Sequence, residues 1–393
     1  MKKKAIHFGA GNIGRGFLGQ LYFESGYATT FVDVVPEVLE ALNARHAYPL
    51  RIVAEDSHTI EIADVRGLHA GDTDQVVEAI AEADIGSTAV GVRVLPKIAP
   101  ALAAGLERRF GDGNAEPLDF VICENMLEAG PFMRERVREH LAPEYHEQLD
   151  AKVGFVEASI GRMVPVMTAE QKAEDPLLVC VEPYCELPVD ANGFRGPIPC
   201  IVHLAPKQNF GAYVERKLFV HNMSHAATAY LGRLRGHDLI WQAVEDPRVR
   251  PEVEKALAET CAGLVAKHGL DAGELREHAG DLLRRYGNKA LGDQIARIGG
   301  DPVRKLGHRD RLIGAGLMCL DQGIEPKGVA FATAAALHYE NADDASAQRL
   351  QEVRRNGGVD GVLRKICEIE PDSPLASLIH DGLERLEREG WLS

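Results

Sequence analysis

A glycine-rich turn near the N-terminus constrains the fold more than any other feature of the sequence. A short apolar run over residues 4–8 leads into Gly9, Gly11 and Gly14, which form a Gly-x-Gly-x-x-Gly motif, and a helical pattern follows over 17–25. The first glycine permits the tight turn, the second lets the backbone approach a pyrophosphate, and the third lets helix pack on strand. The helix N-terminus would face the phosphates with free N–H groups. The motif therefore predicts a dinucleotide site.

A second strand supports this prediction. The β-rich run 29–32 ends at Asp33, roughly 20 residues beyond Gly14, where an acidic residue binds the adenosine ribose hydroxyls. The carboxylate would repel a 2′-phosphate, and Val34 and Val35 supply no arginine to bind one, so we expect NAD rather than NADP as cofactor. The predicted cofactor-binding residues are Ala5, Ile6, His7, Phe8, Gly9, Ala10, Gly11, Asn12, Ile13, Gly14, Arg15, Gly16 and Asp33.

Strands alternate with helices over the rest of the first 160 residues, which predicts right-handed βαβ units and a parallel sheet. The alternating segment 50–68 predicts an added β-hairpin. The other expected elements are helices over 76–83 and 95–109 and strands over 85–90, 118–123 and 153–160.

The second half of the chain has a different pattern. Residues 170–199 are rich in Pro, Asp, Glu and Gly and read as a connecting region, and beyond Pro206 the pattern is helical nearly to the end. We predict an α/β, Rossmann-type dinucleotide-binding domain over 1–195, followed by a mostly α-helical substrate domain over 196–393. The expected helices lie at 212–234, 238–245, 249–268, 273–285, 309–320, 328–339, 345–355 and 374–388.

Composition excludes several classes of partner. A formal net charge of −15 disfavours nucleic acid and anionic membranes. No apolar run approaches the ~20 residues of a membrane helix, and no export signal follows the first lysines, so we expect a cytoplasmic protein. We also expect a monomer or weak homodimer, although the sequence does not decide between them. The seven cysteines lack zinc-like spacing, which predicts reduced thiols and no metal site.

One helix carries an unusual polar face. At roughly 100° per residue, Lys217, Asn222 and His225 fall on an arc of less than half the circumference of the predicted helix 212–234. The face is either a solvated surface or a site, because these groups would be costly to bury without partners. The opposite, core-facing side is expected to hold Phe219, Met223, Ala226, Ala227 and Tyr230.

The pattern Lys-x4-Asn-x2-His resembles that of the polyol-specific long-chain dehydrogenases, a family of metal-independent sugar-alcohol oxidoreductases. The resemblance covers the whole chain and is closest to the mannitol-1-phosphate 5-dehydrogenase branch. It implies Lys217 as general base, Asn125 and Asn222 as amides that hold the alkoxide, and His225 as an orienting partner. The segments that carry it are 6–16, 41–46, 123–125, 153–156 and 215–219.

The expected chemistry is consistent with these residue types. Removing a hydride from a secondary alcohol leaves a carbonyl only if the hydroxyl proton also leaves. A lysine can accept that proton when burial lowers its pKa toward roughly 7 or 8. Asn125 directly follows a predicted strand, where ligands of such sheets bind, although it is equally placed to cap the helix beginning near Glu128.

Substrate recognition is expected from the second domain. Arg297 resembles a substrate-contacting arginine of the family, or is a surface helix residue. The segment 297–311 is unusually basic, which predicts phosphate ligands among Arg304, Lys305 and Arg309, or else a solvated charged loop. Relatives carry an acidic residue that contacts a sugar hydroxyl where this chain has Gly161.

The resemblance thus implies an NAD-dependent enzyme that interconverts D-mannitol 1-phosphate and D-fructose 6-phosphate. An alternative on the same framework is a mannitol 2-dehydrogenase, acting on an unphosphorylated polyol, or a sugar-uronate reductase. A non-catalytic NAD-binding sensor module is a further alternative, which would have no use for three polar residues on one helix face.

Overall fold

The computed structural model describes residues 2–165 and 167–392. The chain forms two compact units, Met1–Tyr213 and Val214–Ser393. The predicted boundary at 195/196 lies in the irregular segment that precedes the last strand of the first unit. Among the described residues, no helix is both long and apolar enough to cross a membrane.

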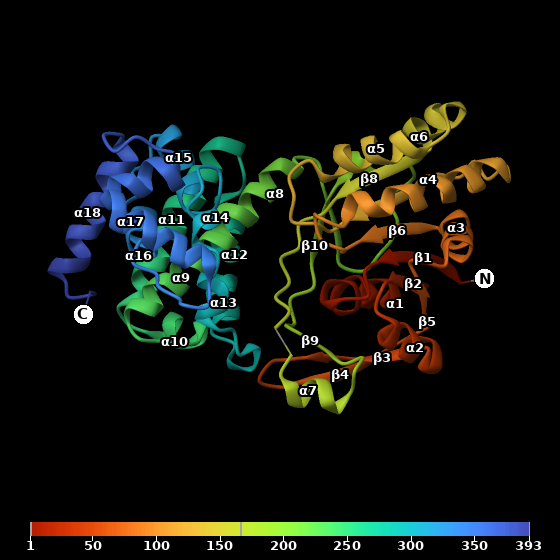
Figure 1. The fold of residues 1–393 in the computed structure, drawn as a ribbon, viewed down its shortest axis with the longest axis horizontal. Coiled ribbons are helices and arrows are strands. Elements are labelled where there is room, and N and C mark those ends of the chain that lie inside the picture. The colour runs from red at the N-terminus through yellow and green to blue at the C-terminus, as the bar shows by residue number, and fades with distance from the viewer. Residues whose placement is uncertain (1, 166, 393) are drawn as a thin grey trace. The chain divides into compact units, whose positions relative to one another are not determined.

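The first unit is built on a six-stranded sheet in which every pair of neighbouring strands is parallel (Figure 1). The strand order is β5-β2-β1-β6-β7-β8. The order reverses between β1 and β6, and in open sheets of this kind ligands bind at that point, beyond the carboxyl ends of the strands. The strands are β1 (Lys3–Phe8), β2 (Tyr27–Asp33), β5 (Val65–His69), β6 (Ile85–Thr88), β7 (Leu118–Ile122) and β8 (Val153–Glu157).

Helices cover both faces of this sheet because successive side chains of a strand point to opposite faces. From β1, Ile6 and Phe8 enter a core with the helices α3, α4 and α5, whereas Ala5 enters another core with Phe17 and Leu21. The predicted Rossmann-type fold is confirmed. Its helical segments are η1 (Gly14–Leu18, a π-helix), α1 (Gly19–Glu24), α2 (Pro36–Arg45), α3 (Thr73–Ala81), α4 (Leu95–Gly111), α5 (Ala129–His140), η2 (Pro143–Tyr145), α6 (His146–Lys152), α7 (Ala169–Glu174) and η3 (Ala191–Gly193).

The segment predicted as a hairpin is only partly one. Strands β3 (Ala47–Ile52) and β4 (His58–Ala63) pair antiparallel, and β9 (Val179–Val181) adds to β3 in parallel. The end of the segment is instead β5, an edge strand of the main sheet that pairs with β2. The local alternation of residue types does not distinguish these two partners. The remaining strands, β10 (Leu187–Asp190) and β11 (Leu204–Lys207), pair with each other.

The second unit is helical (Figure 1). Two of its helices, α9 (Met223–Leu234) and α16 (Lys327–Ala336), have buried residues almost all round. Two short helices, α13 and α14, occupy part of the segment predicted as a charged loop. The helical segments are α8 (Phe210–Arg216), which crosses the unit boundary, η4 (Lys217–Asn222), α9 (Met223–Leu234), α10 (Ile240–Glu245), α11 (Val249–His268), α12 (Ala272–Tyr286), η5 (Lys289–Leu291), α13 (Ile295–Gly299), α14 (Pro302–Lys305), α15 (Ile313–Asp321), α16 (Lys327–Ala336), α17 (Ala345–Val362), η6 (Leu363–Cys367) and α18 (Pro374–Arg388).

Candidate functional site

The glycine-rich turn lies at the carboxyl end of β1, where its glycines have different roles. A Cβ on Gly14 would lie 1.9 Å from the carbonyl oxygen of Gly9, so the turn can close only around a glycine. A Cβ on Gly11 would meet nothing within 4 Å, and the residue is exposed. The turn therefore leaves open space in front of Gly11, as close approach of a pyrophosphate requires.

The other residues predicted around this turn differ in what their side chains can reach. Asn12 is exposed, whereas Ala5, Ile6 and Phe8 are buried in the hydrophobic cores. Arg15 is also buried, and its guanidinium donates to the carbonyl oxygens of Ala10, at 2.7 Å, and Leu177. Arg15 therefore holds the turn in place and does not point into solvent.

His7 supports the turn from inside the sheet. Its ring is fully buried, and its Nδ1 lies 2.6 Å from the hydroxyl oxygen of Ser87 on β6. Burial lowers the pKa of His7 to about 3, so the imidazole is neutral. It links β1 to β6 at the point where the strand order reverses.

Asp33 ends β2 beside the turn. Its carboxylate accepts the N–H of Ala10 at 2.5 Å and the N–H groups of Val34 and Val35 at 2.6 and 3.2 Å. These bonds fix the carboxylate at the rim of the turn while the side chain stays partly exposed. That is the position from which it would meet the ribose of a dinucleotide.

Exposed apolar side chains gather at the same ends of the strands. Val34 and Val35 follow β2, Val92 and Val94 follow β6, and Leu127 follows β7, and each of the five is at least 40% exposed. Single exposed apolar residues are ordinary, but a group beyond the carboxyl ends of parallel strands is typical of a ligand site. The sequence analysis missed this signal.

Asn125 is exposed and stands three residues after the end of β7. Its neighbour Glu124 is buried and accepts hydrogen bonds from the Thr88 hydroxyl at 2.5 Å and the Val90 N–H at 2.8 Å. Glu124 thus ties the segment carrying Asn125 to the end of β6. Asn125 is not the N-cap of α5, because that residue is Glu128, and in the first turn of the helix the N–H of Gly130 donates to Oε1 of Glu157 at 3.1 Å.

The predicted helix over 212–234 is confirmed, but it is not α-helical throughout. A π-helical segment, η4, runs from Lys217 to Asn222 between α8 and α9. The N–H of Met223 donates to the carbonyl oxygen of Leu218, five residues earlier, as in a π-helix. Such insertions are rare and frequently occur at functional sites, and side-chain periodicity does not reveal them.

Lys217 is the first residue of the π-helical segment. Burial, and after it the positive charge of Arg311, lower the pKa of Lys217 to about 8. Its side chain remains partly accessible, as does that of Asn222. An amine that titrates near neutral pH can accept a proton at physiological pH and return it.

His225 is held on two sides. Its ring stacks on Tyr286 with the centroids 4.6 Å apart, and its Nε2 lies 3.0 Å from Oδ2 of Asp293, although the two are not aligned for a hydrogen bond. The other oxygen of Asp293 accepts Arg297 Nε at 3.1 Å and also Nη2. Two predicted site residues, His225 and Arg297, therefore share a buried carboxylate that the sequence analysis missed. The only sign of this carboxylate in the sequence is the position of Asp293 four residues before Arg297.

The basic segment proves to be mostly neutralised. Arg304 pairs with Asp301 at 2.7 Å and Asp310 at 3.4 Å, and buried Lys305 donates to the Gly300 carbonyl oxygen. Burial, then the cations of Arg311 and Arg304, lower the pKa of Lys305 to about 7. Arg309 is exposed and has no acidic partner in the described part of the chain.

Arg311 relates the basic segment to Lys217. Its charge acts on Lys217 and on Lys305 and lowers the pKa of both, so the three cations belong to one region of the helical unit. One acidic partner, Asp310, accepts a bond from Arg311 Nε at 2.8 Å. The region is suited to an anionic group, which would restore the charge balance.

Gly161, where the resemblance to the family leads us to expect an acid, packs beside Tyr184: a Cβ there would lie 3.3 Å from the Tyr184 ring. The following Arg162 is buried. It donates to the carbonyl oxygens of Glu182 and Gly16 and to Oε1 of Gln20. Arg162 thus braces the helix after the glycine-rich turn.

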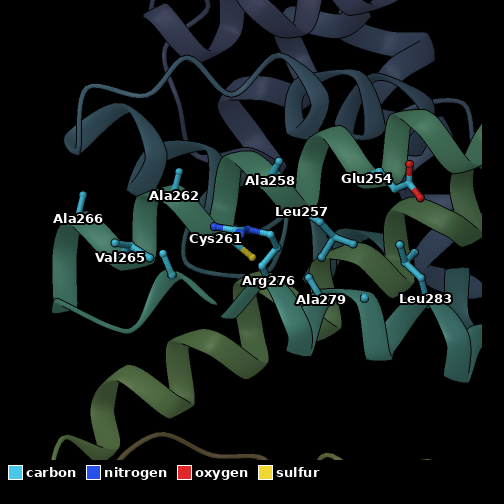
Figure 2. A pocket seen from close by; sticks show the side chains of 12 residues that line it. Glu254, Leu257, Ala258, Cys261, Ala262, Val265, Ala266, Arg276, Ala279 and Leu283 are labelled. Atoms are coloured by element: carbon cyan, nitrogen blue, oxygen red, sulfur yellow. The ribbon is translucent and has the colours of Figure 1, made fainter. Parts of the chain in front are cut away.

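A pocket of about 560 Å³ lies between α11 and α12 (Figure 2). Its wall is mainly apolar, with Leu257, Val265 and Leu283 among the lining residues, and it includes Cys261. None of the predicted site residues lines it. This pocket is therefore separate from Lys217 and its neighbours.

Comparison with known proteins agrees with the fold. Residues 3–202 match the sequence model of the mannitol dehydrogenase Rossmann domain, and residues 209–369 match that of the mannitol dehydrogenase C-terminal domain. Among solved structures, the chain is similar to Pseudomonas fluorescens mannitol 2-dehydrogenase in a ternary complex with NAD and D-mannitol, with a TM-score of 0.75 and 18% identity. That match covers 100% of this chain and 93% of the other.

A second similar structure is that of a D-sorbitol dehydrogenase in substrate-free form. The TM-score is 0.83 at 16% identity, and the match covers 100% of this chain and 94% of the other. At these identities the structural matches establish the fold.

Proposed function

Because the chain belongs to the mannitol dehydrogenase family, we propose that it is an NAD-dependent oxidoreductase that interconverts D-mannitol 1-phosphate and D-fructose 6-phosphate. The observation that carries the reaction type is Lys217, an amine with a pKa of about 8 on a π-helical turn that also bears Asn222. The resemblance to the mannitol-1-phosphate 5-dehydrogenase branch and the cationic region around Arg311 support the phosphorylated substrate.

NAD fits the residues at the ends of β1 and β2. The open space at Gly11 suits the pyrophosphate, and the carboxylate of Asp33 suits the two ribose hydroxyls and opposes a 2′-phosphate. The exposed valines nearby would cover apolar parts of the dinucleotide. When bound, NAD supplies a hydride acceptor in one direction and, reduced, a hydride donor in the other.

In the oxidative direction, neutral Lys217 accepts the proton of the substrate hydroxyl as the C–H hydride leaves, so the alcohol carbon becomes a carbonyl. Asn222 donates its amide N–H to the oxygen while it carries negative charge, and the resemblance to the family implies the same role for Asn125. Each such donor is typically worth a few kcal/mol in the transition state. His225 orients the substrate hydroxyl or the lysine. In the reductive direction, protonated Lys217 returns its proton to the oxygen.

The phosphate would be held by the cations near Lys217. Arg309 is the first candidate because no acidic residue in the described part of the chain pairs with it, and Lys305 is the second because its ammonium gains stability from any added anion. Arg304 is less suited, since Asp301 and Asp310 already accept its bonds. These assignments rest on charge and exposure.

The second candidate is a mannitol 2-dehydrogenase activity on the unphosphorylated polyol. It is favoured by the similar fold of a protein solved with NAD and D-mannitol, and by the acids that neutralise much of the basic segment. A sugar-uronate reductase would also use an anionic substrate.

A single assay separates these candidates. Consumption of NADH is followed at 340 nm with fructose 6-phosphate, fructose and fructuronate, each over a range of concentrations, and repeated with NADPH. We expect the highest kcat/KM with fructose 6-phosphate and NADH. A higher kcat/KM with fructose would establish the second candidate, and no turnover of any of the three would leave only a binding role.

A further inference from the structure

The carboxylate of Asp293 occupies a position that no predicted role explains. It lies in the turn between η5 and α13, and its backbone is fixed on both sides. The carbonyl oxygen of Asp293 accepts the N–H of Ile240 at 2.9 Å. Two residues further on, the N–H of Ile295 donates to the carbonyl oxygen of Asp238 at 2.8 Å. The side chain is only 7% exposed. Asp293 is therefore a rigidly placed, buried anion.

Its two oxygens have different surroundings. Arg297 donates twice to Oδ1, which satisfies that oxygen. Oδ2 makes no hydrogen bond in the described structure, and the group next to it is Nε2 of His225 at 3.0 Å, itself without a hydrogen bond. A buried polar atom without a hydrogen-bond partner destabilises the protein, so a small rotation that aligns Oδ2 with Nε2 would be favourable. Such bonds often tighten only when substrate is bound.

The ring of His225 has little other freedom. Tyr286 stacks on its face with an interplanar angle of 12°, and the Tyr286 hydroxyl donates to the His221 carbonyl oxygen at 2.9 Å. Tyr286 thus fixes the plane of the imidazole, and Asp293 fixes which edge of the ring, the one that carries Nε2, faces the carboxylate. Burial raises the pKa of Asp293, but contacts with His225 and Arg297 outweigh burial and hold it below its usual value. The carboxylate is therefore ionised at neutral pH.

We infer that Asp293 is a positioning residue that holds His225 with its proton on Nε2 and its lone pair on Nδ1, ready to accept a hydrogen bond from the substrate. A carboxylate beside one ring nitrogen selects the tautomer in this way in other enzymes. The same carboxylate anchors Arg297. The inference rests on the proposed function only for its kinetic consequence, because the tautomer of His225 is a property of the protein without substrate.

The first test is spectroscopic and needs no substrate. In protein labelled with ¹⁵N-histidine, the imidazole nitrogen shifts at pH 8.5 report which nitrogen carries the proton, and the signals of His225 are assigned by their absence in His225→Gln. We expect the Nε2–H tautomer in the wild type and the Nδ1–H tautomer in Asp293→Asn, because the asparagine amide can donate to Nε2. Equal tautomers in the two proteins would overturn the inference.

The second test is a double-mutant cycle in the enzyme assay. Asp293→Asn should lower kcat/KM by roughly 10–100-fold, as the loss of comparable positioning groups does, with NADH affinity unchanged. In a His225→Ala background it should lower kcat/KM by less than about twofold further, since a residue that acts through another shows no added effect. If Asp293→Asn lowers kcat/KM by the same factor in the wild type and in the His225→Ala variant, Asp293 does not act through His225.

The chain supplies a matched control. His237 and Asp246 form a second His–Asp pair in the helical unit, with Nε2 and Oδ2 2.8 Å apart, and Asp246 also accepts the N–H of Arg248 at 2.7 Å at the start of α11. Asp246→Asn removes the same charge from a structural pair. We expect it to lower thermal stability and to leave kcat/KM and the His225 tautomer unchanged. If the wild type turns over none of fructose 6-phosphate, fructose and fructuronate, the proposed function is wrong. The spectroscopic test of the His225 tautomer would still decide whether Asp293 positions His225.

Discussion

Lys217 and Asn222 stand at the two ends of one π-helical turn, five residues apart. Since backbone hydrogen bonds in a π-helix join residues five apart, such residues lie nearly above one another along the axis. In a regular α-helix the same two residues would be separated by about 140° around the axis. The extra residue in this turn therefore reduces the angle around the helix axis between the proposed base and the proposed amide donor.

Asn222→Ala should lower kcat by roughly 10²–10³, as removal of one donor to a developing oxyanion does. KM for the sugar should change less, because the amide acts mainly on charge that exists only in the transition state. Steady-state kinetics with fructose 6-phosphate measure both. A change confined to KM would assign Asn222 to ground-state binding instead.

Lys217→Met should retain the fold and NADH affinity and lose roughly 10²–10⁴ in kcat. In the wild type, polyol oxidation needs neutral Lys217, so its rate should rise with pH through about 8, and ketose reduction needs the protonated form, so its rate should fall above about 8. Rate profiles between pH 6 and 10 test the sign in both directions. Lys267→Met, which removes an exposed lysine paired with Glu215, is the control and should leave both profiles unchanged.

Two glycine substitutions should separate folding from cofactor binding. Gly14→Ala forces a methyl group against the Gly9 carbonyl and should destabilise the protein by about 1–3 kcal/mol. The methyl group of Gly11→Ala would contact nothing in the protein, so this variant should have the melting temperature of the wild type. It should nevertheless bind NADH at least tenfold more weakly. Thermal melts and NADH fluorescence titrations measure the two effects. Tight NADH binding by Gly11→Ala would place the pyrophosphate elsewhere.

The nucleotide-binding unit was predictable because its signals are local. Glycines that a turn requires, an acidic residue at the end of the next strand, and alternating strands and helices each follow from neighbouring residues. The edge strand β5 was missed because its partner, β2, is chosen by the tertiary structure and not by the alternation of its own side chains.

The candidate site was only partly predictable for a similar reason. The residue types at Lys217, Asn222 and His225 were visible in the sequence, but the π-helical turn that aligns them is not encoded in any side-chain period. Asp293 lies 68 residues beyond His225, and its contact with that ring depends on how the turn before α13 packs on α9. The neutralisation of Arg304 by two aspartates likewise depends on the short helix α14.

Asp33→Ala should weaken NADH binding and relax the discrimination against NADPH. The substitution removes both the proposed bonds to the ribose hydroxyls and the negative charge that opposes a 2′-phosphate. The substitution also removes the acceptor of the Ala10 N–H, which loosens the turn for both cofactors. The loss of affinity for NADH should therefore be larger than the gain of affinity for NADPH. The ratio of kcat/KM for the two cofactors is the measurement. An unchanged ratio would show that another group selects the cofactor.

Arg309→Ala should raise KM for fructose 6-phosphate about tenfold or more, because a hydrogen bond to a charged group contributes roughly 1.5–3 kcal/mol. The control is Arg304→Ala, which removes an equally exposed arginine whose bonds are already made to Asp301 and Asp310, and which should change KM less than about twofold. KM for fructose 6-phosphate in Lys305→Met should lie between those of the two arginine variants, because the Lys305 ammonium already donates to the Gly300 carbonyl oxygen. None of the three should alter kcat/KM for unphosphorylated fructose, which has no phosphate to lose. If KM for fructose 6-phosphate stays within about twofold of the wild type in all three variants, the phosphate is bound by other residues.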